Sequence, residues 1–362
     1  MPMIPSNWVL HDYLQVNGGA ERVVTTLARE LPNFELGVSG IYADFRGTGD
    51  LTGAKTLVIG RFTGWLPRIP RALFAFTQNH AFLRSAECVI YSGVYAPLAV
   101  ANQTIGRKIY YCHTSPRFAF DREDLTVCSF PGFLRPFLRQ AILKYRKSYL
   151  EAVRSMDVII TNSCHVRERL LRQTGVNAQV IYPPIDTKVF RFLGQEDYYL
   201  SVGRLEPKKR VDRIVKAFLN MPDKKLVVAS GGSELNKLKA LANKAPNIQF
   251  SGWVDRYTLS RMIGKAIAVI YVPWDEDFGM SAVEAMAAGK PVIGVDDGGL
   301  SESVIDGDTG ILLASDPEPQ DIVDAILRLP PNVAAEMRSA CEQRAQSFSE
   351  ARFVSAFKKC IP

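Results

Sequence analysis

The sequence predicts an α/β protein made of two doubly wound, Rossmann-like domains that face each other across a cleft. Short β-branched and aromatic runs alternate with stretches of helical periodicity, the pattern of parallel sheets covered by helices. The 362 residues suffice for two domains, each with its own core. Paired prolines at 183–184 and a polar segment at 194–197 interrupt the pattern and suggest a linker.

The expected strands divide between the two halves of the chain. In the first half they are 8–11, 34–41, 55–59, 88–91, 108–112, 157–161 and 179–182, and in the second half 199–203, 226–229, 248–250, 268–272, 292–295 and 310–313. The domains are therefore expected at 1–185 and 195–345, and a C-terminal helix at about 346–362 could pack back onto the first. Ligands of such sheets bind beyond the carboxyl ends of the strands, so the loops there are the candidate sites.

The composition is that of an ordinary globular protein, with 47% hydrophobic and 22% charged residues. No apolar run reaches the roughly 18 residues that a membrane span needs, and the first residues lack the basic and apolar segments of a signal peptide. The six cysteines are scattered without a CxxC pair, which disfavours a zinc knuckle or a redox dithiol. A cytoplasmic protein with reduced thiols is expected.

The excess positive charge lies in the N-terminal half. Residues 1–180 hold 21 of the 44 Lys and Arg and 13 of the 37 Asp and Glu, so their balance is +8 and that of the rest is −1. Segments 51–86 and 125–150 each carry five basic residues and no acid. Large apolar residues lie between the charges, among them Phe62, Trp65, Leu73, Phe74 and Phe76 in the first segment and Leu134, Phe137, Ile142 and Tyr145 in the second.

Basic charge beside exposed aromatic residues favours contact with an anionic membrane surface. The alternative for 125–150 is a helix that packs its apolar face on the sheet. Nucleic acid is not expected as a partner, because no RNA- or DNA-binding motif accompanies the charge.

Two loops combine glycine with a following helix or with basic residues. Gly18 and Gly19 open a helix whose backbone N–H groups could bind a phosphate, although an ordinary Asn-Gly turn is the alternative. No GxGxxG fingerprint occurs, which weighs against a dehydrogenase. Arg204 and Lys209 follow the strand expected at 199–203 and could converge on a diphosphate; the alternative is a solvated basic loop.

A third loop carries two carboxylates. Glu276 lies after a strand and Glu284 in the first turns of the next helix, with Gly279 between them. Such carboxylates can bind hydroxyls at both ends of a ligand while the helix N-terminus faces its phosphates. The alternative is that Ser281 and Glu284 form a capping box that merely starts the helix.

These loops, with Val-Ile-Tyr-Pro-Pro-Ile-Asp at 180–186 and Gly-Trp-Val at 252–254, resemble the retaining GT-B glycosyltransferases of family 4 across nearly the whole chain. The resemblance implies the GT-B fold, with a nucleotide-sugar donor held mainly by the C-terminal domain. It implies that Arg204 and Lys209 hold the diphosphate, that Glu284 holds the ribose and that Glu276 holds the donor sugar. The other donor-side residues that it implies are Gly18, Gly19, Val254, Phe278, Gly279, Met280 and Ser281.

The segment 111–121 resembles bacterial mannosyltransferases that build O-antigen and related surface polysaccharides. The resemblance implies that His113 lies near the reacting sugar and belongs with Arg204, Lys209 and Glu276 to the catalytic set. His113, Arg117 and Asp121 would form the acceptor side. A GDP-mannose donor is therefore expected.

The expected activity is transfer of a hexosyl unit, mannosyl from GDP-mannose, to a hydroxyl of a lipid-linked glycan at the inner face of the cell membrane. The resemblance implies retention by front-face attack, in which the leaving diphosphate helps to remove the acceptor proton. No cofactor or metal is expected, because the DxD strings at 275–277 and 306–308 are short and Arg204 and Lys209 can balance the diphosphate charge. The alternatives are a GT-B sugar-nucleotide epimerase, which needs no acceptor, and an inactive GT-B subunit that binds a partner.

Overall fold

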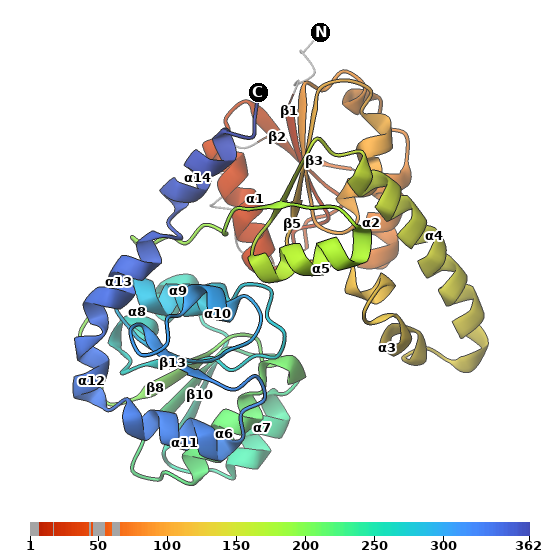
Figure 1. Cartoon of the computed structure of the whole chain (residues 1–362). Coiled ribbons are helices and arrows are strands. Elements are labelled where there is room, and N and C mark those ends of the chain that lie inside the picture. The colour runs from red at the N-terminus through yellow and green to blue at the C-terminus, as the bar shows by residue number, and fades with distance from the viewer. Residues whose placement is uncertain (1–6, 17, 43–44, 46–54, 60–65) are drawn as a thin grey trace. The chain divides into compact units, whose positions relative to one another are not determined.

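The computed structural model describes residues 7–16, 18–42, 45, 55–59 and 66–362. They belong to two compact units, residues 1–184 with 353–362, and residues 185–352. Each unit is a parallel sheet covered by helices (Figure 1).

The first unit has a seven-stranded sheet in the order β3-β2-β1-β4-β5-β6-β7. Its strands are β1 (Asn7–His11), β2 (Phe34–Val38), β3 (Thr56–Val58), β4 (Cys88–Ser92), β5 (Arg107–Cys112), β6 (Val158–Thr161) and β7 (Gln179–Val180). Both faces are buried, since Trp8 and Leu10 pack on one side of β1 and Val9 on the other. This explains why its strands are nearly continuous apolar runs.

Helices cover both faces of this sheet. Helix α1 (Gly19–Glu30) and the C-terminal α14 (Glu350–Lys358) pack on the face of Val9. Residues of α2 (Arg68–Thr77), α3 (Glu123–Cys128), α4 (Arg135–Arg154) and α5 (Cys164–Thr174) pack on the face of Trp8. Phe353 and Phe357 of α14 contact the ring of Tyr111, so the end of the chain completes this core.

The second unit has a six-stranded sheet in the order β10-β9-β8-β11-β12-β13. Its strands are β8 (Tyr199–Val202), β9 (Leu226–Ala229), β10 (Ile248–Gly252), β11 (Val269–Ile270), β12 (Val292–Val295) and β13 (Gly310–Leu313). Its helices are α6 (Val211–Leu219), α7 (Leu235–Ala242), α8 (Arg256–Lys265), α9 (Met280–Ala287), α10 (Leu300–Ser303), α11 (Pro319–Arg328), α12 (Pro331–Glu336) and α13 (Arg338–Gln346). The strand order reverses between β8 and β11, which is where doubly wound sheets bind ligands.

The two parallel sheets expected from the sequence are confirmed, and each expected strand has a counterpart. The polar segment 194–197, suggested as a linker, is instead bonded to the second unit. The Leu193 N–H donates to the Gly264 carbonyl over 2.9 Å, and the Glu196 N–H to the Lys265 carbonyl over 2.6 Å. The units therefore meet in sequence at Pro184–Ile185, and the C-terminal helix is shorter than expected.

Candidate active site

A lysine and a glutamate, both largely buried, meet at the carboxyl edge of the second sheet. Lys209 Nζ donates to Glu276 Oε2 over 2.5 Å and to the Tyr271 hydroxyl over 2.6 Å. That hydroxyl donates in turn to Glu276 Oε2 over 2.9 Å. The other carboxylate oxygen, Oε1, accepts no hydrogen bond from any residue that the structure describes. The three side chains form a closed polar cluster with one oxygen and one ammonium hydrogen left for a ligand.

The pair holds its charges although both side chains are largely shielded from water. Burial by itself would lower the pKa of Lys209, but Tyr271 and Glu276 outweigh it and the pKa is raised. Burial by itself would raise the pKa of Glu276, and the Lys209 ammonium more than offsets this, so that pKa is lowered. Both groups are therefore charged at neutral pH.

The loop after β8 carries Lys209 into this cluster. Gly203 turns the chain at φ +115°, where a Cβ would lie 3.2 Å from the Tyr271 ring. Arg210, at φ +50°, begins α6 and donates to the carbonyls of Val272 over 2.9 Å and Pro273 over 2.6 Å. Because Arg210 ties the two loops together, its neighbour Lys209 is held against the end of β11.

The acidic loop is held from the other side by glycines. The Gly299 N–H donates to the Glu276 carbonyl over 2.8 Å, and a Cβ on Gly298 would lie 2.3 Å from that same oxygen. Gly279 precedes α9 at φ +86°, and a Cβ there would lie 3.6 Å from both Glu276 Cγ and the Tyr271 ring. Backbone approaches Glu276 this closely only because these residues lack side chains.

The remaining residues predicted on the donor side differ in how far their side chains are exposed. Arg204 is largely exposed and pairs with Glu206 over 3.2 Å. Glu284 is buried in α9, and the capping-box alternative is wrong, because α9 begins after Gly279 without a side-chain cap. The Phe278 side chain is buried and faces the Phe348 ring, whereas Met280, Ser281 and Val254 are half-buried.

In the first unit, two glycines precede α1 as expected. Gly18 is its N-cap, and the Arg22 N–H donates to the Gly18 carbonyl over 3.0 Å. Gly18 and Gly19 are half-buried. Their role toward a phosphate stays a prediction.

His113 lies at the carboxyl edge of the first sheet with two residues that sequence reasoning missed. Its Nε2 is 2.8 Å from Ser92 Oγ, and His11 Nδ1 is 3.0 Å from the same oxygen. Burial and the neighbouring His11 hold the pKa of His113 well below its usual range, and burial lowers the pKa of His11 to about 4. The site therefore holds neutral imidazoles bridged by a serine hydroxyl.

Asp12 fixes the loop beside these histidines. Its carboxylate accepts the N–H groups of Val94, Tyr95 and Ala96, each over 2.8 Å. Burial nevertheless raises the pKa of Asp12 to about 6. Sequence motifs of neighbouring residues could not reveal this role of Asp12, because its hydrogen-bond partners are more than 80 positions away in the chain.

Arg117 and Asp121 are bonded to each other. Nε and Nη2 of Arg117 lie 2.9 and 2.8 Å from Asp121 Oδ2. The Asn162 amide donates to the His113 carbonyl over 2.9 Å, which links β6 to the same edge. The acceptor roles of His113, Arg117 and Asp121 stay predictions.

The DxD strings lie in separate structural contexts. The Asp275 N–H donates to Asp297 Oδ2 over 2.9 Å, and Asp306 Oδ1 accepts the Leu312 N–H over 2.8 Å. Within the described ranges, no group of three or more His, Cys, Asp or Glu side chains is arranged to hold a metal ion.

The two basic segments were expected to expose their large apolar side chains, and the structure exposes some of these side chains and buries others. In the first, Phe76 is buried in the core, while Ile69, Leu73 and Phe74 are exposed on α2. Arg61, Phe62 and Trp65 lie outside the described residues. In the second, Ile142 and Tyr145 pack in the core, as the packing alternative expects, whereas Leu134 and Phe137 are exposed. Contact of this segment with a membrane stays a prediction. No helix among the described residues has the length and apolar character to cross a bilayer.

Two family descriptions match adjacent parts of this chain. Residues 17–189 match Glycosyltransferase Family 4, and residues 185–348 match Glycosyl transferases group 1. An uncharacterized glycosyltransferase of Methanocaldococcus jannaschii is 30% identical over 60% of this chain and 61% of its own length. A D-inositol 3-phosphate glycosyltransferase of Mycobacterium avium is 33% identical over 55% of this chain and 53% of its own length. The chain thus spans between half and two thirds of these relatives.

Solved structures share the fold along nearly the whole chain. Anabaena HepE, in complex with UDP and glucose, aligns with a TM-score of 0.76 over 98% of both chains at 16% identity. The apo form of the lipopolysaccharide outer core galactosyltransferase WaaB aligns with a TM-score of 0.68 over 98% of both chains at 17% identity. At these identities the likeness shows the fold.

Proposed function

The chain belongs to the GT-B glycosyltransferases of the family 4 and group 1 type, and we propose that it transfers a hexosyl unit from a nucleotide sugar to a hydroxyl group. The observation that carries the proposal is the Lys209–Glu276 pair, a charged and largely buried pair at the reversal point of the second sheet. In a purely structural ion pair both carboxylate oxygens are usually bonded to the protein, whereas Glu276 Oε1 accepts no hydrogen bond from the described residues.

In this proposal, Lys209 places positive charge beside the donor diphosphate, and Glu276 Oε1 accepts hydrogen bonds from the sugar hydroxyls. Arg204 adds a second cation to the diphosphate, and Glu284 binds the ribose. Phe278, Gly279 and Met280 contribute backbone at the start of α9, whose N–H groups favour a nearby phosphate. Charge that develops on the leaving diphosphate is then stabilised by groups that are already in place.

We further propose mannose, carried by GDP, as the sugar, retention at its anomeric carbon, and a lipid-linked glycan as the acceptor. The support is the likeness of segment 111–121 to mannosyltransferases of surface polysaccharide synthesis and the position of neutral His113 at a strand end. HepE was solved with UDP and glucose, so uridine donors are the principal competitors.

A donor panel tests the proposal. The purified chain is offered GDP-mannose, UDP-glucose, UDP-galactose and UDP-N-acetylglucosamine, and release of the nucleoside diphosphate is measured with and without a lipid-linked glycan. We expect GDP release from GDP-mannose, stimulated by acceptor and lost in Glu276→Gln.

Turnover of a uridine donor alone would remove the mannosyl part of the proposal. Sugar released without any acceptor dependence would favour the epimerase. A chain that consumes no donor and does not bind one would favour the inactive binding subunit.

A further inference from the structure

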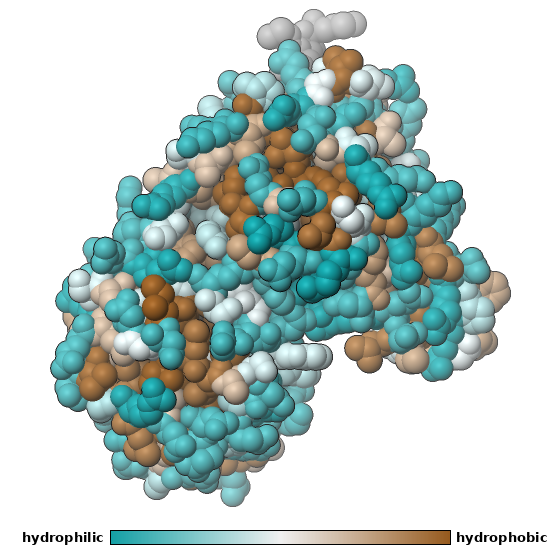
Figure 2. Space-filling view, in the orientation of Figure 1, coloured by the Kyte–Doolittle hydropathy of each residue, from teal (hydrophilic) through white to brown (hydrophobic). Residues whose placement is uncertain are grey.

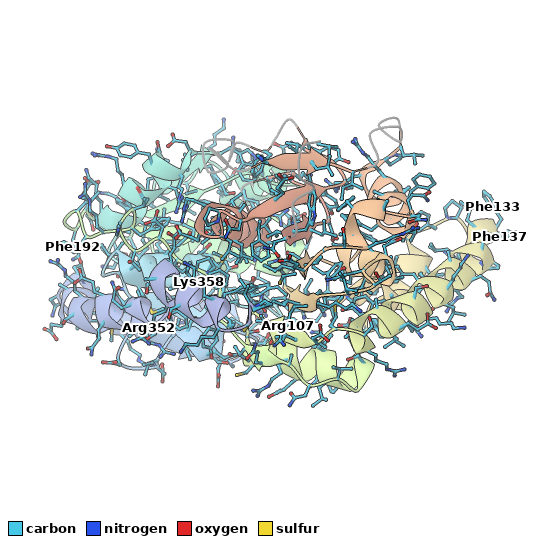
Figure 3. The ribbon with its side chains drawn as sticks, turned by 90° about the horizontal axis from the view of Figure 1, so that it is seen from above. Arg107, Phe133, Phe137, Phe192, Arg352 and Lys358 are labelled. Atoms are coloured by element: carbon cyan, nitrogen blue, oxygen red, sulfur yellow. The ribbon has the colours of Figure 1, made fainter. Side chains whose placement is uncertain are left out.

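Exposed apolar side chains gather at one end of the first unit. We call this the α3–α4 tip, defined as residues 123–137. Its exposed large apolar residues are Leu125, Phe130, Phe133, Leu134 and Phe137, and the side chains of Phe133 and Phe137 are the most open, at 74% and 75% exposure. Figure 3 shows both phenylalanines at the outer end of α4, and Figure 2 shows hydrophobic residues over this region. Single exposed apolar residues are ordinary, but a contiguous group marks a contact surface.

Apart from Val127 of α3, which is buried in the core, the tip keeps its large apolar side chains out of the core of its unit. The second half of α4 packs through Ile142, Tyr145 and Tyr149, whereas residues 135–141 contain no buried side chain. Polar contacts also hold the tip: Arg135 donates to the carbonyls of Phe130 and Cys128 over 3.0 and 3.2 Å. The tip is ordered although Phe133 and Phe137 are not buried, so these two rings are available to a partner.

The charge beside the tip is positive. Helix α4 carries six basic residues and one acid. The two acids of α3 are neutralised, because Glu123 bonds to Arg146 and Asp124 lies 3.0 Å from Arg139. Lys144 and Lys147 are exposed and have no ion-pair partner in the described part of the chain.

We propose that the α3–α4 tip inserts Phe133 and Phe137 among the acyl chains of an anionic phospholipid bilayer while Lys144 and Lys147 contact lipid phosphates. Aromatic rings and lysines in this combination are typical of proteins that lie at a membrane interface. Charge argues against a second copy of this chain as the occupant, since two basic tips would repel each other. The inference deepens the proposed function, because it brings the enzyme to a lipid-linked acceptor, but the surface exists whatever the activity.

Sedimentation with vesicles tests the insertion. The vesicles contain equal parts of phosphatidylglycerol and phosphatidylcholine, and pure phosphatidylcholine vesicles serve for comparison. Wild type should bind the anionic vesicles and Phe133→Ser/Phe137→Ser should bind roughly tenfold more weakly for each ring removed. The matched control Ile105→Ser/Leu327→Ser also removes two exposed apolar side chains and should bind like wild type.

Reversing the charge of the two lysines measures the electrostatic contribution to vesicle binding. Lys144→Glu/Lys147→Glu should weaken binding about fivefold or more for each lysine, and added salt should weaken wild-type binding. Arg135 and Arg139 are unsuitable for this test, because they hold the tip together. Lys239→Glu/Lys359→Glu makes the same change in net charge at other exposed positions and should leave binding unchanged.

Cys128 reports the depth of insertion. It is the one exposed cysteine of the chain, and it lies within the tip. An environment-sensitive fluorophore on Cys128 should shift its emission to the blue with anionic vesicles, and a quencher on the lipid acyl chain should reduce the signal.

Several outcomes would overturn the proposal: wild type that ignores anionic vesicles, tip variants that bind like wild type, or a label that stays in water. Loss of self-association in Phe133→Ser/Phe137→Ser, without vesicle binding by wild type, would assign the tip to a second copy instead. Donor hydrolysis in the absence of membranes should be equal in all these variants, so failure of the membrane inference and failure of the proposed function are distinguishable.

Discussion

Lys209 Nζ lies 2.5 Å from Glu276 Oε2, although the two residues are 67 positions apart. Lys209 follows β8 and Glu276 follows β11, and these strands are neighbours in the sheet. The strand order reverses between them, and such a reversal point is where doubly wound sheets bind their ligands. Tyr271 bonds to both members of the pair and fixes their geometry.

Removing either member of this pair should reduce sugar transfer. Lys209→Ala deletes the cation proposed for the diphosphate and leaves Glu276 without its counter-charge, and Glu276→Gln removes the acceptor proposed for sugar hydroxyls. Each lost charge-assisted contact costs about 1.5 to 3 kcal/mol, which corresponds to a rate loss of roughly ten- to a hundredfold or more. The measurement is the initial rate of nucleoside diphosphate release at saturating acceptor.

Lys216→Ala is the matched control, since Lys216 lies on α6 and its ion pair is with Asp212 at the surface. It should retain the wild-type rate. Near-normal turnover by Lys209→Ala would remove Lys209 from the site.

A methyl group on Gly298 should displace Glu276. The new Cβ would lie 2.3 Å from the Glu276 carbonyl oxygen, so the acidic loop must move. Gly298 also has φ +62°, where a side chain adds strain of about 1 to 2 kcal/mol. We expect Gly298→Ala to lose most transfer and to lower the midpoint of thermal unfolding.

Gly307→Ala separates these two effects. Gly307 has φ +78°, but a Cβ there would have no heavy atom within 4 Å. It should therefore lower the unfolding midpoint by backbone strain and keep its transfer rate per folded molecule. Equal activity loss in both variants would mean that strain, and not the position of Glu276, decides the outcome.

Much of this architecture could be predicted from the sequence, because strands that are buried on both faces are continuous apolar runs separated by helical periodicity. Lys209 and Glu276 were predicted as separate ligand residues, but their pairing depends on the strand order, which local patterns do not contain. Tyr271 and Arg210 were missed for the same reason. Ser281 and Glu284 have capping-box spacing, yet Gly279 with its positive φ begins the helix instead.

Chelation should leave the reaction unchanged. In our proposal Lys209 and Arg204 balance the charge of the leaving diphosphate, so no divalent ion is needed. Initial rates are measured after dialysis against excess EDTA and again after addition of Mg²⁺ or Mn²⁺. Complete loss in chelator that either metal restores would show that an acidic string such as 275–277 has a role that this proposal omits.

Two adjacent buried residues should shift the pH dependence of stability in opposite directions. Burial lowers the pKa of His11 from 6.5 to about 4, so its contribution to stability is present above pH 6.5 and is lost as the pH falls toward 4. Burial raises the pKa of Asp12 from 3.8 to about 6, so its contribution is present below pH 3.8 and is lost as the pH rises through 6. The pKa of His113 is lowered as well, so the histidines should prevail and stability should rise from about pH 4 to 6.5.

Asp12→Asn removes the opposing contribution and should make this rise steeper. The midpoint of urea unfolding, followed by fluorescence between pH 4 and 7, gives the slope. The substitution also replaces the oxygen that accepts the Val94 N–H by an NH2 group that cannot accept, but that loss is the same at every pH and does not enter the slope. Asp223→Asn changes an acid that is largely exposed beside Lys224, and its slope should equal that of wild type. If Asp12→Asn has the wild-type slope, Asp12 is ionised across this range, and its three backbone donors outweigh the effect of burial.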